Sequence, residues 1–179
     1  MFAIASTVYI STTEPTVPLW DCPEYTATAV KLEVGHPAGA PLYQMMGAVI
    51  SNMFDVEAEN VAFVMNVFAC LSSAVAIMLL FWIITFFARR ILGRNWEELS
   101  TPEAIATIGS GIVGSSAILF SDTFWFNATE SEVYSLATLF TVLLLYFGVR
   151  WINGFGRPRN NKWLILVALM TGLAPGVHF

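Results

Sequence analysis

Four long runs without a charged residue constrain the fold of this chain more than any other feature. They cover residues 61–88, 104–121, 133–149 and 163–179, in a chain whose hydrophobic content is 56%. The hydrocarbon core of a bilayer needs a helix of ~20 apolar residues, with a range of about 17–25. Because lipid offers the backbone no hydrogen-bond partner, and the runs lack the alternation of a barrel strand, we expect helices. The sequence therefore predicts an all-α polytopic membrane protein.

Both ends of the chain look like incomplete spans. The apolar residues 2–10 would form a helix of only about 14 Å, roughly half a span, and they lack the positive region and cleavage site of a signal peptide. The last run reaches Phe179 with no polar residue after it. We therefore expect a single transmembrane domain, residues 1–179, that is a fragment of a longer protein. Its expected parts are a partial first span (1–10), a first outer loop with interfacial helices (11–60), spans at 61–88, 104–121 and 133–150, a second outer loop (122–132) and a truncated fifth span (163–179).

The charged residues predict the topology. Seven of the eight Lys and Arg residues lie in two short segments, 89–94 and 150–162. The positive-inside rule places both segments in the cytoplasm. Residues 11–60 and 121–132 then lie on the opposite side, with ten of the thirteen acidic residues and one cation, Lys31. Acidic residues contribute little to topology, so their accumulation indicates either loop solvation or a functional site.

Several classes of site are not indicated. The two cysteines, Cys22 and Cys70, do not make a disulfide framework, and no Cys/His cluster has zinc spacing. No phosphate-binding glycine loop, nucleic-acid-binding surface or Ser/His/Asp pattern is visible. We expect neither a metal ion, nor a cofactor, nor a nucleic-acid partner.

The segment 20–41, WDCPEYTATAVKLEVGHPAGAP, is an island of charge between apolar runs. Asp21 and Glu24, around Pro23, have the spacing of a capping box at a helix start, so they are either helix caps or reactive carboxylates. The glycines and prolines of residues 35–41 end that helix. His36, in this turn, is either a ligand-binding group or a turn residue bonded to local backbone.

The next segment and the second span carry structural patterns. Residues 42–54 place apolar side chains on one helical stripe, which predicts an amphipathic helix that lies in the membrane interface and packs on the protein. Residues 104–121 contain the pair Gly111/Ser115 among several small residues. Such pairs favour close packing of helices in membranes.

The second outer loop adds three carboxylates, Asp122, Glu130 and Glu132, which taken alone are most simply solvated loop charges. His178 follows a Pro-Gly break in the last run and arrives on the same outer side. Together the loops bring five carboxylates and a histidine toward one membrane face. A positioned carboxylate can take a proton from an acceptor hydroxyl, and an imidazole or cation can stabilise a phosphate leaving group.

Three segments carry a resemblance to a known family. WDCPEYTATAVKLEVGHPAGAPLY resembles the first outer loop, FSDTFWFNATESEVYSL the second outer loop, and GLAPGVH the fifth span of a bacterial membrane-protein family that is commonest in Bacteroidota. That family is related to the eukaryotic transmembrane protein O-mannosyltransferase of the endoplasmic reticulum. Both belong to the GT-C class of many-helix glycosyltransferases, which use polyprenyl-phosphate-linked sugars. Pro23 and Ala38 depart from the glycine and proline of the family pattern.

The resemblance implies a role for each candidate residue. Asp21 would be the catalytic base, or would position the acceptor, with Glu24 in support. His36 would shape the donor or acceptor pocket, and His178 would approach the lipid phosphate. The second-loop acidic position would be filled from this set: Asp122, Glu130 and Glu132.

The resemblance implies a GT-C-like helix bundle that transfers a mannose-like sugar, with inversion, from a polyprenyl-phosphate donor to a hydroxyl, in particular that of protein Ser/Thr. The expected partners are membrane lipid, the lipid-linked donor and a protein or glycan acceptor. The expected location is the bacterial inner membrane, with the active loops on the periplasmic side. Two alternatives stay open: a transporter or flippase subunit, and a non-catalytic envelope assembly protein.

Overall fold

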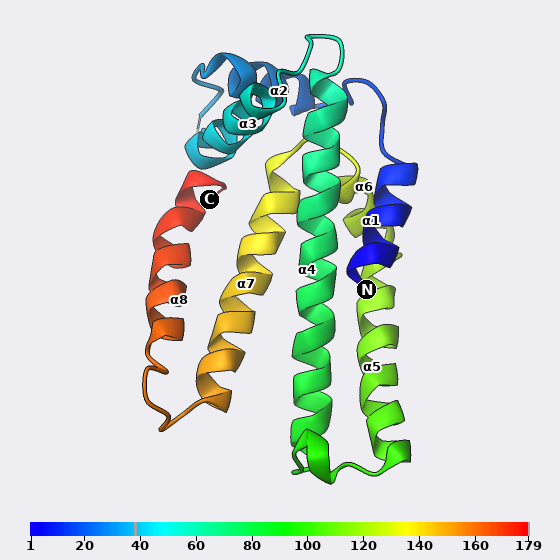
Figure 1. The fold of residues 1–179 in the computed structure, drawn as a ribbon. Coiled ribbons are helices and arrows are strands. Elements are labelled where there is room, and N and C mark those ends of the chain that lie inside the picture. The colour runs from blue at the N-terminus through cyan, green and yellow to red at the C-terminus, as the bar shows by residue number, and fades with distance from the viewer. Residues whose placement is uncertain (38, 179) are drawn as a thin grey trace.

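The computed structural model describes residues 1–37 and 39–178, so the family departure at Ala38 and the last residue, Phe179, lie outside the described residues. Within them the chain is all-helical: eight α-helices and two 3-10 turns, with no strand among the described residues. The prediction of an all-α membrane bundle is confirmed. Figure 1 shows an elongated bundle with two short helices across one end.

Three helices are long and apolar enough to cross a membrane: α4 (Val61–Ile91), α5 (Thr101–Leu119) and α7 (Val133–Asn153). α4 is the central element, because α1 (Phe2–Ser11), α5 and α7 all pack against it (Figure 1). α8 (Lys162–Leu173) packs on α7 and continues into the turn η2 (Ala174–Gly176). α8 is therefore shorter than the span expected over residues 163–179.

Small residues bring α4 and α5 close together. Thr107, Gly111 and Ser115 are the buried stripe of α5, spaced one turn apart. A Cβ built on Gly111 would lie 2.5 Å from Cγ2 of Thr85 and 2.8 Å from the ring of Phe81 on α4. The predicted packing role of Gly111/Ser115 is confirmed, since only a glycine fits at the contact point.

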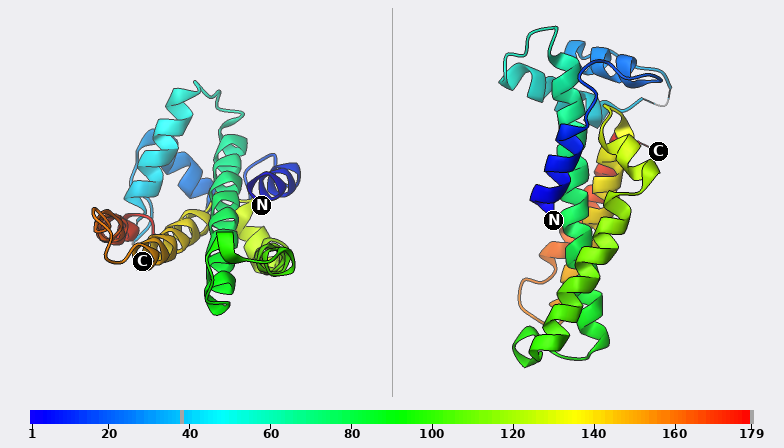
Figure 2. Two further views of the ribbon diagram at one scale, coloured as in Figure 1. Left: turned by 60° about the horizontal axis from the view of Figure 1, so that its bottom comes forward. Right: turned by 90° about the vertical axis from the view of Figure 1, so that its right-hand side faces the viewer.

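The first outer loop folds into two short helices, α2 (Cys22–Lys31) and α3 (Pro41–Met53), which pack on each other across one end of the bundle (Figures 1 and 2). α2 ends where Leu32 adopts a left-handed conformation (φ 52°). The second outer loop contains a short helix that the sequence did not predict, α6 (Asp122–Ala128). The arginine-rich connections, α4 to α5 with the turn η1 (Trp96–Glu98) and α7 to α8, lie at the other end (Figure 1).

α3 packs with its polar side inward. Its buried residues include Tyr43, Gln44 and Ser51, and Nε2 of Gln44 donates a hydrogen bond to Oγ1 of Thr28 on α2 (2.9 Å). The apolar stripe faces outward: Met53 is 72% exposed. This arrangement suits a helix in a membrane interface, which presents its apolar side to lipid.

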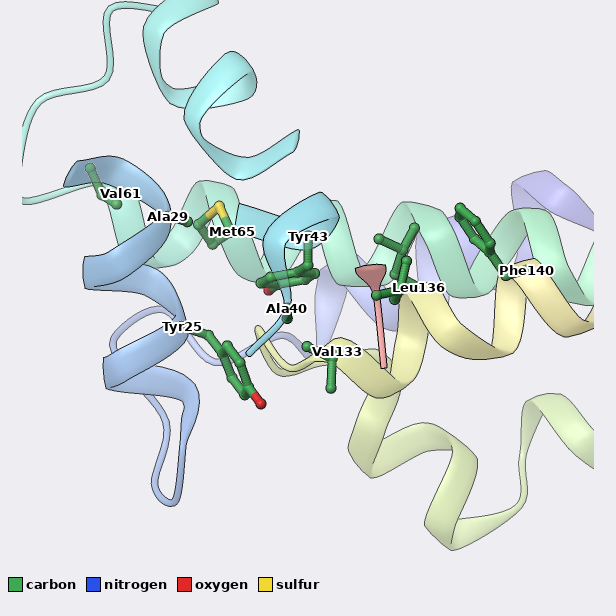
Figure 3. Close-up of a cluster of buried hydrophobic side chains, with 10 residues drawn as sticks. Tyr25, Ala29, Ala40, Tyr43, Val61, Met65, Val133, Leu136 and Phe140 are labelled. Carbon is green, nitrogen blue, oxygen red and sulfur yellow. The ribbon is translucent and has the colours of Figure 1, made fainter. Parts of the chain in front are cut away.

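A cluster of buried hydrophobic side chains anchors this end of the bundle (Figure 3). It joins α2, α3, α4, α7 and the residue after η2, and consists of Tyr25, Ala29, Ala40, Tyr43, Val61, Met65, Val133, Leu136, Phe140 and Val177. Burial of apolar surface stabilises the folded state by about 25 cal/mol per Å² of buried area. The cluster therefore fixes both outer loops on the long helices.

Candidate active site

Side-chain contacts hold the two outer loops together. Sγ of Cys22, at the start of α2, donates to Oε1 of Glu132, just before α7 (3.5 Å). The hydroxyls of Thr26 and Ser131 are 3.1 Å apart and share a hydrogen bond. All four residues are buried. The loops that the sequence predicted on one side of the membrane therefore form one continuous surface.

Asp21 lies at this junction. It is the N-cap residue of α2 and is exposed, and its side chain makes no capping hydrogen bond. The Asp21 charge nevertheless contributes to the raised pKa values of Tyr25 and Glu132, so its carboxylate lies near both groups. The capping-box alternative for Asp21 and Glu24 is wrong, because neither carboxylate bonds the backbone of the helix start.

Glu24 binds the turn that contains His36 instead. One carboxylate oxygen accepts the backbone N–H of His36 (2.5 Å), and the other lies 3.1 Å from Nδ1 of the imidazole. A Cβ on Gly35 would lie 3.2 Å from the Glu24 oxygen, so a glycine allows the turn to approach the carboxylate. The backbone hydrogen bond, followed by the side-chain bond, lowers the pKa of Glu24. His36 is therefore a turn residue held by the Glu24 side chain, its ring is half exposed, and its ligand-binding role stays a prediction.

Glu130 and Glu132 lie deeper than the other carboxylates. Glu132 is only 8% exposed, and burial raises its pKa, with a further contribution from Asp21. Burial also raises the pKa of Glu130, and the charges of Glu132 and Glu14 add to the effect. In the described part of the chain no Lys or Arg forms an ion pair with these groups. They are not simple solvated loop charges, since a raised pKa and burial are typical of acid–base groups in active sites.

The same three side chains form a possible metal-donor set. Sγ of Cys22 and one carboxylate oxygen each of Glu130 and Glu132 lie within 4.8 Å of one another. Thiolate and carboxylate ligands suit a divalent cation such as zinc. The thiol also donates a hydrogen bond to Glu132 in this arrangement.

Two tyrosines connect the histidines to the carboxylates. The ring centroid of Tyr25 is 5.7 Å from that of His36, and the ring centroid of Tyr134 is 5.2 Å from that of His178. Burial raises the pKa of Tyr25, and the charges of Asp21, Tyr134 and Glu132 raise it further. Each histidine ring thus packs against a tyrosine, one on α2 directly after Glu24 and the other on α7 two residues after Glu132.

Asp122 lies apart from this surface. It is exposed in the first turn of α6, in a hollow of about 380 Å³ lined by Phe120, Trp125, Phe126 and Thr129. None of the hydrogen bonds among the described residues joins the Asp122 side chain to the other predicted site residues. Of the other predicted residues, Glu24 bonds His36, Glu130 and Glu132 both lie against Cys22, which follows Asp21, and His178 lies against Tyr134.

Sequence reasoning missed Cys22, Tyr25 and Tyr134 as members of the site. Cys22 and Tyr25 are three residues apart and thus share one face of α2. Tyr134 lies in the first turn of α7, two residues after Glu132. The available signal was that each of these residues lies within two positions of a predicted carboxylate. That signal does not distinguish a site residue from a core residue.

These features define a membrane protein with an all-helical bundle and an acidic, tyrosine-lined site at one end. Residues 21–179 match the family described as the protein O-mannosyl-transferase TMEM260 N-terminal domain. The chain belongs to this family. No solved structure matches the chain significantly.

Two curated relatives carry the name protein O-mannosyl-transferase TMEM260. The mouse protein is 28% identical over 174 residues, which are 97% of this chain and 22% of the mouse protein. The Dictyostelium discoideum protein is 21% identical over 163 residues, which are 91% of this chain and 18% of that protein. The chain therefore spans about a fifth of the length of these relatives.

Proposed function

We propose that this chain forms the catalytic N-terminal part of a membrane O-mannosyltransferase of the GT-C class. It would move mannose from a polyprenyl-phosphate donor to a Ser or Thr hydroxyl. The contact between Cys22 and Glu132 carries the proposal, because it brings the start of α2, with Asp21, against the buried carboxylates of the second loop. The names of the relatives and of the family support the reaction class.

The proposed reaction is an inverting displacement. The acceptor hydroxyl oxygen attacks the anomeric carbon of the sugar, the bond from that carbon to the phosphate oxygen breaks, and polyprenyl phosphate leaves from the opposite face. Asp21 takes the hydroxyl proton as general base. Its exposed carboxylate, free of a capping bond, supports this role, since an incoming hydroxyl can reach it.

The surrounding groups position the reactants. Glu24 holds the turn at His36, and the imidazoles of His36 and His178 would stabilise the phosphate leaving group. Glu130 and Glu132 would bind the acceptor near Asp21. The site would face the periplasmic side of a bacterial inner membrane, a proposal supported by the arginine-rich loops at the other end of the bundle.

The test uses the full-length protein reconstituted in vesicles with a radiolabelled polyprenyl-phosphate mannose and a Ser/Thr-rich acceptor peptide. The proposal predicts label in the peptide, with release of polyprenyl phosphate. Movement of the labelled lipid between leaflets without transfer to any hydroxyl acceptor would contradict it and favour the flippase alternative.

A further inference from the structure

A second hollow lies at the end of the bundle away from the candidate active site. It is a pocket of about 440 Å³ near the ends of α4 and α7, and Trp96 of η1 also lines it. Its walls are largely aromatic and include Phe81, Trp82, Phe86 and Tyr146. Two arginines, Arg89 and Arg150, also line it. None of these residues takes part in the proposed transfer reaction.

Arg89 is a buried cation with unused hydrogen-bonding capacity. It is 7% exposed, and its Nη1 donates to the backbone carbonyl of Arg94 (2.7 Å). Its Nε is buried without a hydrogen-bond partner. An arginine stays protonated inside a protein, and a buried charge is costly unless it is paired. The same Nη1 lies 3.5 Å from Oδ1 of Asn95, so Arg89 bonds only neutral oxygens of the chain and keeps an unused donor at Nε.

Neither arginine of the pocket forms an ion pair with the described part of the chain. Among the described residues, the ion pairs are Glu24 with His36 and Arg94 with Glu103, and neither includes a pocket arginine. Hydrogen bonds from Asn95 lower the pKa of Glu98, and the charges of Arg94 and Arg89 lower it further. The Glu98 carboxylate is thus bonded to Asn95 and not to Arg89. Arg150 is exposed, and its guanidinium lies 4.9 Å from the ring centroid of Trp163. The pocket thus presents two cations, and among the described residues no carboxylate forms an ion pair with either of them.

The position of the pocket identifies the kind of anion. α4 and α7 are apolar enough to cross a membrane, and the arginines lie in the last turns of these helices. Basic pockets between spans bind lipid phosphate headgroups, and tryptophans mark the membrane–water interface. Two cations beside an aromatic wall complement a molecule with a phosphate and an apolar tail. We propose that this pocket binds the phosphate headgroup of an anionic membrane lipid.

The test measures lipid retention by the full-length protein in nanodiscs of phosphatidylcholine with a minor share of phosphatidylglycerol. Native mass spectrometry counts the lipids that stay bound after release. The wild type should retain phosphatidylglycerol in excess of its share. An arginine in contact with the headgroup contributes about fivefold to anionic lipid binding, so Arg89→Gln with Arg150→Gln should lower retention by more than tenfold.

Two further variants make the test independent of folding. Arg150→Gln alone changes an exposed residue and should lower retention about fivefold. Arg157→Gln with Arg159→Gln removes the same charge at the same end but outside the pocket lining, and should retain the wild-type preference. Equal retention by the pocket pair and this control pair would overturn the proposal.

Two other results would also overturn it. If the wild type shows no preference for phosphatidylglycerol, a later segment of the longer protein occupies the pocket. If excess inorganic phosphate displaces the lipid completely, the pocket recognises free phosphate and not a lipid. The sugar-transfer assay tests the site at the opposite end of the bundle. A negative result in the lipid-retention assay is therefore no evidence against the proposed transferase activity.

Discussion

Nδ1 of His36 lies 3.1 Å from Oε2 of Glu24, and the other oxygen of this carboxylate accepts the backbone N–H of His36. These two bonds close a loop of twelve residues on the first turn of α2. Glu24, for which the sequence left a helix cap and a reactive carboxylate open, is thus the attachment point of the turn after that helix. The consequence is that Glu24 controls where the His36 imidazole sits.

Loss of the Glu24 carboxylate should loosen this turn. We expect Glu24→Ala to speed amide hydrogen exchange in a peptide covering residues 32–37, because the backbone N–H of His36 loses its acceptor. Glu33→Ala, at an exposed residue of the same turn, is the matched control and should leave exchange unchanged. Equal exchange in both variants would show that the Glu24 bond does not order the turn.

The same contact has a defined pH dependence. The pKa of Glu24 is lowered below its ordinary value of 4.5, so the stabilisation is present above pH 4.5 and is lost as the pH falls through the lowered pKa. The protection factor of the His36 amide, which corrects for the intrinsic pH dependence of exchange, should therefore stay constant at neutral pH and fall only in acid. A fall that begins above pH 5 would contradict the hydrogen-bonded carboxylate.

Glu130 should have the opposite effect on stability. Burial and the Glu132 charge raise its pKa, so the native state binds this proton more tightly than the unfolded state. Its contribution is present at low pH and is lost as the pH rises through the raised pKa. We expect Glu130→Gln to raise the melting temperature at pH 8 and to have no effect at pH 4. Glu57→Gln, at an exposed loop residue, serves as the control, and an identical response in both would refute the prediction.

The contact between α4 and α5 can be tested with two glycines of one helix. A Cβ on Gly111 would lie 2.5 Å from a Thr85 carbon, whereas a Cβ on Gly109 would meet no atom within 4 Å. Gly111→Ala should destabilise the protein by about 1–3 kcal/mol through overpacking. Gly109→Ala should stabilise it by up to ~1 kcal/mol through helix propensity. Thermal unfolding in detergent measures both, and the same sign for both variants would contradict the close contact.

Cys22 should react slowly with thiol reagents. Burial raises the pKa of its thiol well above the ordinary value, and the charges of Glu132 and Glu130 raise it further. The thiolate is the reactive form, so maleimide labelling at pH 7 should be at least about a hundredfold slower than at a control cysteine on the exposed side of α2, Ala27→Cys. The comparison is made in a Cys70→Ala background. Equal labelling rates would contradict the buried contact with Glu132.

The sequence predicted the membrane-spanning helices because their signal is local. A long uncharged run needs only its own composition to be recognised, so α4, α5 and α7 were expected within a few residues of their ends. The helix of residues 42–54 was also expected. The periodicity could not show that its polar face packs inward, because Gln44 finds its partner, Thr28, on another helix.

Several residues of the site could be predicted from the sequence, but the contacts between them could not. The charge pattern indicated that Asp21 and Glu132 face one side of the membrane. It could not show that the Cys22 thiol, next to Asp21, donates a hydrogen bond to Glu132, or that Asp122 lies apart from them on α6. Both depend on how the two loops fold. The tyrosines at positions 25 and 134 were hidden for another reason: an aromatic residue at a helix start is most simply a core or interface residue.

The central claim is that Asp21 is the general base of sugar transfer, and one substitution tests it most directly. Asp21→Asn keeps the shape of the side chain and removes its basicity. It is compared with Asp55→Asn, at an exposed acidic residue beyond α3, in the full-length protein with labelled polyprenyl-phosphate mannose. The account predicts that Asp21→Asn inserts in the membrane normally and loses transfer by at least about a hundredfold, while Asp55→Asn keeps it. Transfer by Asp21→Asn at the wild-type rate would contradict the account.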